Sequence, residues 1–490
     1  MIEEENLLSD LKRLGKHSAI YGLSNALCSA IGFFLIPLYT KRLTPAEYGV
    51  WELFFVAIIF LPLVLELGLG SALFKAVLFD SKEKEHALIN TAFLFIAGFS
   101  SLVLCLLYLN AASISAVLIG MPDDAHLFKL VLLVVFFNVL AIIPMSALRM
   151  REQSLKYGLM NLIKFITGLA LNIYFIAVLG KGVEGIVFAN VIQSALFIAC
   201  LLLVCRNCLG FSFSKSALAE MLKFGMPLVL ISISFVILNM SDRYFLRFYA
   251  GIEELGLYSI GYKIGMAMNM VVGSIQVAWP TIMYKTAKKK NGPDFFARSL
   301  TYVTLILMAI WLVISLFTRE IFVLFTSPAY YAAQGIVPVI LLSYLLVGIY
   351  YLTAIGANVK HKTHYLAFAA TTACGVNLLL NYLLIPRFGM YGAAAATVFS
   401  FFIMTAISYR ASIRLFPVPY EWGRIGKSVV LAFGLYFVGR FVSAENTALA
   451  IIFKSALVLL FPTLLYFFNI LVKKEKLVLQ NLLMTKPRIY

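Results

Sequence analysis

The sequence predicts an all-α integral membrane protein with about fourteen transmembrane helices. Of its 490 residues, 62% are hydrophobic and only 13% are charged, whereas soluble domains have about 25% charged residues. Apolar runs of about 20 residues, each long enough to cross a hydrocarbon core about 30 Å thick, recur along the whole chain. Because no period-two alternation persists within these runs, helices are favoured over the strands of a β-barrel. The composition excludes a water-soluble fold.

The first six runs form a predicted N-terminal lobe, residues 1–210. They cover residues 17–40, 49–74, 87–110, 127–148, 159–179 and 186–205. The stretch before them, MIEEENLLSD, is acidic and does not resemble a cleavable signal peptide. We therefore expect the first helix to act as its own insertion signal.

The next six runs form a predicted second lobe, residues 211–415. They cover residues 226–248, 256–284, 300–325, 336–357, 365–385 and 392–412. Two additional helices, at 427–442 and 449–471, follow in the segment 416–490 and precede a tail that we expect to be cytoplasmic. No connecting segment exceeds about 20 residues, which leaves no room for a soluble catalytic domain. The helices themselves must carry the function.

An internal repeat relates the two lobes. The segment EYGVW contains Glu47, and the segment ELGLY contains Glu254, 207 positions later. At the same separation, Gly182 in GKGVEG matches Gly389 in RFGMYG. An even number of crossings per repeat leaves both copies in the same orientation, so we expect an axis along the membrane normal and a cleft between the lobes.

The net charge of +17 is distributed as in a multi-pass membrane protein. Loops after even-numbered helices, together with the two termini, hold 27 of the basic residues, and loops on the other side hold 7. By the positive-inside rule, both termini lie in the cytoplasm. Since topology explains the charge, we expect no nucleic-acid partner.

Six basic residues belong to no loop: Lys75, Lys164, Arg243, Arg247, Lys263 and Lys454. A charge at the bilayer centre costs about 2.5–3.5 kcal/mol on insertion scales. Each of these residues should therefore face a partner, a watery cavity or the membrane interface.

Three of the cations share one predicted layer with a single acid. Counting 1.5 Å per residue places Asp242 and Arg243 about 22 Å across the membrane, with Lys263 of the next helix at a similar depth and Arg247 nearer the outer interface. One acid cannot neutralise three cations, so an exchangeable anion or water is one explanation. The alternative is an Asp242–Lys263 pair with both arginines reaching outward.

A second layer is predicted near the inner boundary. Glu66 and Lys164 fall at similar depths, where a structural ion pair is as reasonable as a substrate contact. We expect Lys75 to be interfacial, and Lys454, in the last helix, to extend toward the interface. The cysteines and histidines show no metal-ligand spacing, so no metal is predicted.

Two segments carry a resemblance to a known family: LGKHSAIYGLSNALCSAIGFFLIPLYTKRLTPAEYGVWELFF near the start and SDRYFLRFYAGIEELGLYSIGYKIG across the seventh and eighth runs. Together with the helix plan, they resemble the polysaccharide-transporter family. That family includes the O-antigen and capsule repeat-unit flippases of the multidrug/oligosaccharidyl-lipid/polysaccharide exporter superfamily. The resemblance covers nearly the whole chain.

The resemblance implies a non-enzymatic transporter of the bacterial or archaeal cytoplasmic (inner) membrane. Its cargo would be an oligosaccharide linked to undecaprenyl pyrophosphate, turned between leaflets by alternating access, as in lipopolysaccharide assembly. The residues implied to bind the head group are Arg243, Arg247, Lys263, Lys164 and Lys75. No cofactor is expected apart from a coupling H⁺ or Na⁺, for which Asp242 and Glu66 are candidates. Implied partners are membrane lipids and other polysaccharide assembly proteins.

Three alternatives stay open at the level of sequence. A drug or cation exporter of the same superfamily would favour an acidic cavity, whereas the excess here is basic. A lipid II flippase shares the helix count and a cationic cavity. A membrane-embedded polymerase or glycosyltransferase would need a positioned acid or base, for which only Asp123 with Asp124 and Glu253 with Glu254 offer outer carboxylate pairs. Both pairs are more simply explained as solvated loop charges.

Overall fold

The computed structural model describes residues 32–77, 82–118, 120, 125–441, 447–468 and 470. Every regular element in these ranges is a helix, and ten helices are long and apolar enough to span a membrane. The all-α membrane fold is thus confirmed. The first predicted run, 17–40, falls mostly outside the described residues, so the total of fourteen stays a prediction.

Packing divides the chain into two compact units. The first comprises the chain up to Ile264 together with Phe325–Ala333 and Ala370–Ser400, and the second comprises Gly265–Leu324, Gln334–Ala369 and the chain from Phe401. Segments from the predicted second lobe, 211–415, therefore pack within the first unit. The repeat boundary in the sequence is not the boundary of packing.

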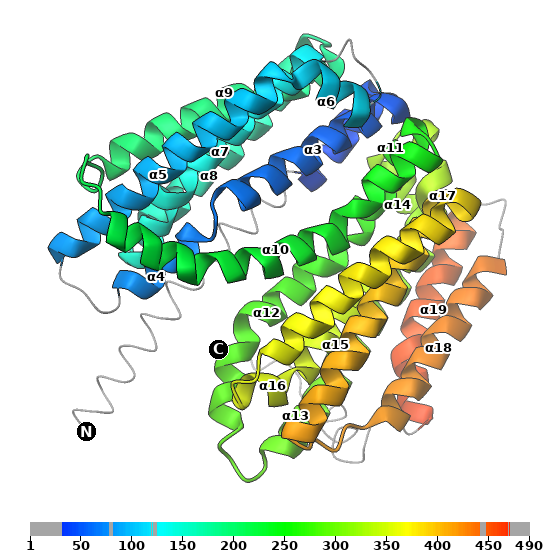
Figure 1. Cartoon of the computed structure of the whole chain (residues 1–490). Helices are drawn as coiled ribbons and strands as arrows, with labels where there is room; N and C mark the ends of the chain where they lie inside the picture. The colour runs from blue at the N-terminus through cyan, green and yellow to red at the C-terminus, as the bar shows by residue number, and fades with distance from the viewer. Residues whose placement is uncertain are drawn as a thin grey trace, which may run out of the picture. The chain divides into compact units, whose positions relative to one another are not determined.

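The first unit is built mainly from the helices of the first half and the hairpin that follows. These are α2 (Ile36–Arg42), α3 (Pro45–Leu65), α4 (Leu69–Val77), α5 (Lys82–Leu109), α6 (Ala111–Leu118), α7 (Ala125–Met150), α8 (Ser154–Asn172), the π-helix η2 (Ile173–Val178), α9 (Gly182–Cys205), α10 (Lys215–Tyr249) and α11 (Ile252–Gly265). Helices α5, α7, α8 and α9 pack side by side (Figure 1). The buried side chains of Tyr157, Phe197 and Leu201 form part of one apolar core between them.

The second unit contains most of the remaining helices. They are α12 (Ala267–Thr286), α13 (Gly292–Leu316), α14 (Thr318–Phe325), the 3₁₀ helix η3 (Pro328–Ile336), α15 (Val337–Thr353), α16 (Ile355–Val359), α18 (Trp422–Phe441) and α19 (Thr447–Phe467), of which η3 and the end of α14 extend into the first unit. Trp311 of α13 anchors this unit, since its ring lies 4.6 Å from that of Phe433 and its indole N–H donates to the Pro338 carbonyl at 2.9 Å.

Helix α3 has a defined start and a sharp end. At its start, Thr44 and Glu47 form a capping box that satisfies two free backbone N–H groups. At its end, Leu67 and Gly68 both have positive φ, and a β-carbon on Gly68 would lie 2.4 Å from the Gly225 carbonyl oxygen of α10. Only glycine permits this close approach. The break separates α3 from α4 within the second predicted run.

Helix α17 (His364–Leu415) consists of two helices joined at Gly389, where φ is 51° and ψ is −131°. It therefore contains the predicted runs 365–385 and 392–412 with a break between them. A β-carbon at Gly389 would lie 2.0 Å from Oε1 of Glu254, and the same oxygen accepts a 2.7 Å hydrogen bond from the Met390 N–H. Glu254 thus holds the break and is not the solvated loop charge that the sequence predicted.

The internal repeat appears in the structure as a reciprocal contact. A β-carbon on Gly49 of α3 would lie 2.1 Å from the Ile252 carbonyl oxygen, and one on Gly256 of α11 would lie 1.8 Å from the Pro45 carbonyl oxygen. Gly49 and Gly256 are separated by 207 positions, as are Pro45 and Ile252. Such reciprocity is the mark of a two-fold relation between the starts of α3 and α11.

Candidate functional site

The predicted outer layer of charge is centred on adjacent residues of α10. Asp242 and Arg243 are 1% and 4% exposed, and Arg243 Nη1 donates at 2.7 Å both to Asp242 Oδ1 and to the Asn239 carbonyl. Tyr258 of α11 donates to the other carboxylate oxygen at 2.5 Å. The guanidinium also lies 4.2 Å from the centre of the Tyr262 ring, while its Nε has no hydrogen-bond partner among the described residues.

The second cation of this layer belongs to α11 and is paired with α3. Lys263 Nζ donates to Glu52 Oε1 at 2.5 Å and also to the Tyr48 hydroxyl. Glu52 is 1% exposed and Tyr48 is fully buried. The ammonium lies 5.2 Å from the Phe55 ring, so one side of it is apolar. This ion pair joins the first copy of the repeat to the second.

The structure corrects the charge count made from the sequence. Two cations, Arg243 and Lys263, meet two acids, because Glu52 also lies in the layer. The alternative Asp242–Lys263 pair is wrong as well, since each acid has a different partner. A charge removed from water needs compensation by a nearby opposite charge and by hydrogen bonds, and both pairs provide it. We refer to Glu52, Asp242, Arg243 and Lys263 as the charge layer.

Arg247 lies one turn further along α10 and outside this group of pairs. Its guanidinium packs against Gly120, where a β-carbon would lie 1.7 Å from Nη2. Gly120 has a φ of 75°, so the loop after α6 adopts a conformation that suits glycine at that point. Arg247 of α10 therefore packs directly against the Gly120 backbone.

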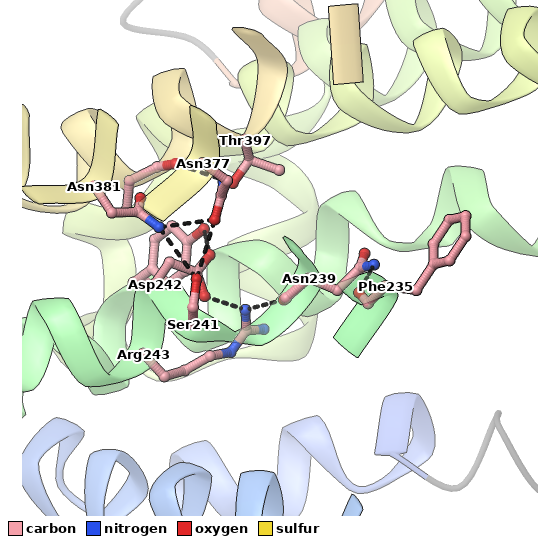
Figure 2. Close-up of polar contacts among 10 residues, drawn as sticks. Phe235, Asn239, Ser241, Asp242, Arg243, Asn377, Asn381 and Thr397 are labelled. Carbon is pink, nitrogen blue, oxygen red and sulfur yellow. Dashed lines mark hydrogen bonds and ion pairs between the residues drawn. The ribbon is translucent and has the colours of Figure 1, made fainter. Parts of the chain in front are cut away.

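A cluster of buried amides and hydroxyls adjoins the charge layer (Figure 2). Ser241 Oγ donates to Asn377 Oδ1 at 3.0 Å, and Asn381 Nδ2 donates to the same oxygen at 2.9 Å. Asn377 Nδ2 and Asn381 Oδ1 have no partner among the described residues. These groups connect α10 to the first half of α17, beside Thr397 of its second half. These residues could not be predicted from the sequence, because neutral amides in an apolar run carry no charge signal.

The remaining predicted site residues lie elsewhere. Lys75 is exposed, with its ammonium 4.4 Å from the centre of the Phe224 ring, and its interfacial position stays a prediction. Lys164 lies 5.0 Å from the Phe197 ring. Glu66 lies beside Gly70, and the expected pairing of Glu66 with Lys164 stays a prediction. The structure therefore does not bring these three residues into the charge layer.

Two further expectations concern acids and cations outside the layer. Lys454 of α19 is paired with Glu320, at 2.6 and 2.9 Å from its two oxygens, so it does not extend freely to the interface. Asp123 and Asp124 lie outside the described residues. Over the described part of the chain, no group of three or more His, Cys, Asp or Glu side chains could hold a metal ion.

Comparison with known proteins places this architecture in a family. The profile of a family described as "Polysaccharide biosynthesis protein" matches residues 40–333, which is more than half of the chain. The chain belongs to this family. The match includes α3, α10 and α11, and with them all four residues of the charge layer.

Curated relatives match only part of their length. The chain is 24% identical over 205 residues to an uncharacterized membrane protein of Methanocaldococcus jannaschii, and 23% identical over 289 residues to the succinoglycan biosynthesis transport protein ExoT of Rhizobium meliloti. The matched parts are 39% and 57% of those two proteins. The chain thus spans well under two thirds of either relative.

Solved structures share the fold. The lipid II flippase MurJ in an inward closed conformation superposes with a TM-score of 0.75 at 17% identity, over 92% of this chain and 100% of that one. An inward-facing multidrug resistance MATE transporter of the MOP superfamily gives 0.68 at 16% identity, over 79% and 94%. The chain therefore shares the fold of solved membrane transporters and belongs to a family of polysaccharide biosynthesis.

Proposed function

We propose that the protein is a flippase that moves an isoprenoid-pyrophosphate-linked oligosaccharide from the inner to the outer leaflet by alternating access. One observation supports it above the others. At the repeat separation of 207 positions, Asp242, Arg243 and Lys263 correspond to Leu35, Ile36 and Val56. The first copy of the fold is built with apolar residues at these positions. The scaffold does not need the charges, so they serve the cargo.

The chemistry of the cations suits a pyrophosphate. Guanidinium and ammonium groups bind phosphate oxygens through charge-assisted hydrogen bonds. A pyrophosphate and its sugars cannot enter hydrocarbon without such partners, whereas the isoprenoid tail can remain among lipid chains. In this proposal Lys263 exchanges the Glu52 carboxylate for a phosphate oxygen when cargo is bound, and Arg243 adds a second contact.

The same exchange offers a route to ion coupling. When Lys263 turns to the cargo, Glu52 is left buried without its counter-ion, which costs several kcal/mol unless a proton or a Na⁺ ion neutralises it. Glu52 thus joins the earlier candidates Asp242 and Glu66 as a coupling residue. Asp242 is a weaker candidate, because Arg243 is its sequence neighbour and stays within reach throughout.

An assay of surface glycan tests the cargo assignment. Arg243→Ala and Lys263→Ala, expressed at levels matched to the wild type in the native host, should lose surface glycan and accumulate lipid-linked repeat units. Lys129→Ala is a suitable control, because Lys129 lies 5.0 Å from the Tyr108 ring and away from the charge layer. Normal export by both site variants would contradict the assignment.

A second candidate is a lipid II flippase, which the superposition with MurJ over nearly the whole chain favours. Lipid II also carries an isoprenoid pyrophosphate, so the charge layer does not separate the two. Complementation does: the gene should restore surface glycan to a strain that lacks its polysaccharide flippase, and should not sustain growth of a strain depleted of its lipid II flippase. The reverse result would select the second candidate.

A further inference from the structure

The second unit contains a hollow of about 370 Å³ that is lined mainly by residues of α12, α15 and α16. Its chemistry differs from that of the charge layer. The side chains that matter most are two amides and four aromatics: Gln276, Trp279, Tyr284, Tyr350, Tyr351 and Asn358. None of the described residues that line it is charged.

Several polar groups of this hollow lack a protein partner. The Trp279 indole N–H is buried and unpaired, although the side chain is 8% exposed. Within the described part of the chain, the Gln276 amide and the hydroxyls of Tyr350 and Tyr351 also have no recorded hydrogen bond. An unsatisfied donor or acceptor in a membrane helix costs free energy. Water or a hydroxyl-rich ligand would satisfy all four.

The position of Gln276 argues that the hollow is wet. Gln276 is exposed in the middle of α12, and Gln276, Pro280 and Tyr284 lie on one face of that helix at i, i+4 and i+8. An amide that faced lipid would have no partner for its two donors. Trp279 and Tyr350, which are nearly buried, form the floor, while Tyr284 is 43% exposed at the rim.

We propose that this hollow is a saccharide subsite that binds one or two neutral sugar rings of the lipid-linked cargo. Aromatic rings offer flat apolar faces to the C–H face of a sugar, and amides and tyrosine hydroxyls match its hydroxyl groups. The absence of charged lining residues disfavours a phosphate or a cationic drug. A volume of about 370 Å³ lies at the small end of ligand pockets of about 300–1,000 Å³.

This subsite rests on the proposed function and assigns two parts of the cargo to two different sites. The charge layer takes the pyrophosphate, and the hollow takes sugar. Tyr284 and Asn358 lie near the ends of α12 and α16, next to Lys285 and Lys360, which the charge distribution places on the cytoplasmic side. The subsite would therefore bind the sugar at the cytoplasmic face of the membrane, where the cargo is made.

Saturation-transfer NMR on the full-length protein in nanodiscs tests the subsite. The probe is the free repeat-unit oligosaccharide, released by mild acid from the lipid-linked material that accumulates in flippase-deleted host cells. Trp279→Ala and Gln276→Leu should each weaken saccharide binding about tenfold or more, and Trp279→Phe, which keeps a ring but loses the N–H, should weaken it less. Inorganic pyrophosphate should not compete.

Control variants and the source of the probe separate the possible failures. Trp422→Phe removes an indole whose N–H donates to the Tyr409 hydroxyl outside the hollow, and should bind saccharide like the wild type. If deleted cells accumulate no lipid-linked saccharide, the proposed function itself fails. If they do, but correctly folded Trp279→Phe and Gln276→Leu proteins bind the saccharide as tightly as the wild type, the subsite is refuted and the flippase stands.

Discussion

The start of α3 and the start of α11 are two copies of one piece of structure, and they differ in their charged residues. Gly49 and Gly256 make reciprocal backbone contacts, so the packing is shared. Glu47 and Glu254 are also equivalent, and they lie beside the equivalent glycines Gly182 and Gly389. The charges are not shared, because the second copy and the hairpin before it carry Asp242, Arg243 and Lys263.

The charge layer also breaks the symmetry of pairing. Glu52 and Lys263 pair across the two copies, but the positions equivalent to them are Ser259 and Val56. Ser259 is fully buried, and its hydroxyl has no partner among the described residues. The two copies thus share a symmetric packing scaffold, but the polar residues placed on it are not symmetric. Packing residues are duplicated, whereas residues that we assign to the cargo occur once.

The largest expected effect concerns the shared packing. Gly49→Leu and Gly256→Leu would each push a side chain into a backbone carbonyl, so both should lose about 3 kcal/mol or more of stability and most of the transport activity. Gly273→Leu is the control, since a β-carbon at Gly273 meets nothing within 4 Å. Thermal unfolding and surface glycan measure the two effects. If Gly49→Leu left stability unchanged while Gly256→Leu lowered it, the two backbone contacts would not be equivalent.

An effect of similar size is expected from the unshared charges. Lys263→Met leaves Glu52 buried without a cation, which should destabilise the fold by about 3–5 kcal/mol. Lys454→Met is the comparison, because its partner Glu320 has a side chain that is 21% exposed and can be hydrated. We expect a loss of about 1 kcal/mol or less there. Equal losses in thermal unfolding would show that burial does not distinguish the two pairs.

A smaller loss of stability is expected at the two equivalent glutamates, and it should be greater for Glu254 than for Glu47. Glu47→Ala removes a local capping box and should cost about 1 kcal/mol. Glu254→Ala removes a charged acceptor from the Met390 N–H at the break of α17 and should cost about 2 kcal/mol. Chemical or thermal unfolding of both variants gives the order. A greater loss for Glu47→Ala would mean that the break of α17 does not depend on Glu254.

The smallest effect is expected at Lys75. Its ammonium lies over the Phe224 ring at an exposed position, so Lys75→Met should change stability by about 0.5–1 kcal/mol and leave transport intact. Surface glycan at matched expression checks it. A strong loss of transport would return Lys75 to the head-group site that the sequence predicted.

The sequence predicted the fold well because its signal is one-dimensional. Apolar length and the placement of Lys and Arg identify membrane helices, and identical spacings between glycines reveal the repeat. Depth along a helix is also a simple count, which is why Asp242, Arg243 and Lys263 were placed in one layer. Helix breaks such as Leu67–Gly68 leave weaker signals, because neighbouring backbone decides them.

Pairing could not be predicted in the same way. It depends on the rotation of each helix and on side-chain reach, neither of which a count of residues supplies. Arg243 and Asp242 point about 100° apart on α10, yet the long arginine side chain folds back to its neighbour. Glu52 was not predicted as a member of the charge layer, because it is a single acid in an apolar run and its partner Lys263 lies on a helix that is distant in the sequence.

One measurement tests the central claim most directly. The double variant Glu52→Gln with Lys263→Met removes the ion pair without leaving either charge buried alone, so it should fold with nearly wild-type stability. If Lys263 exists to hold the cargo phosphate, cells with this variant should accumulate lipid-linked saccharide and display little surface glycan. If instead they export glycan at the wild-type rate, the pair is structural and the account of the charge layer is wrong.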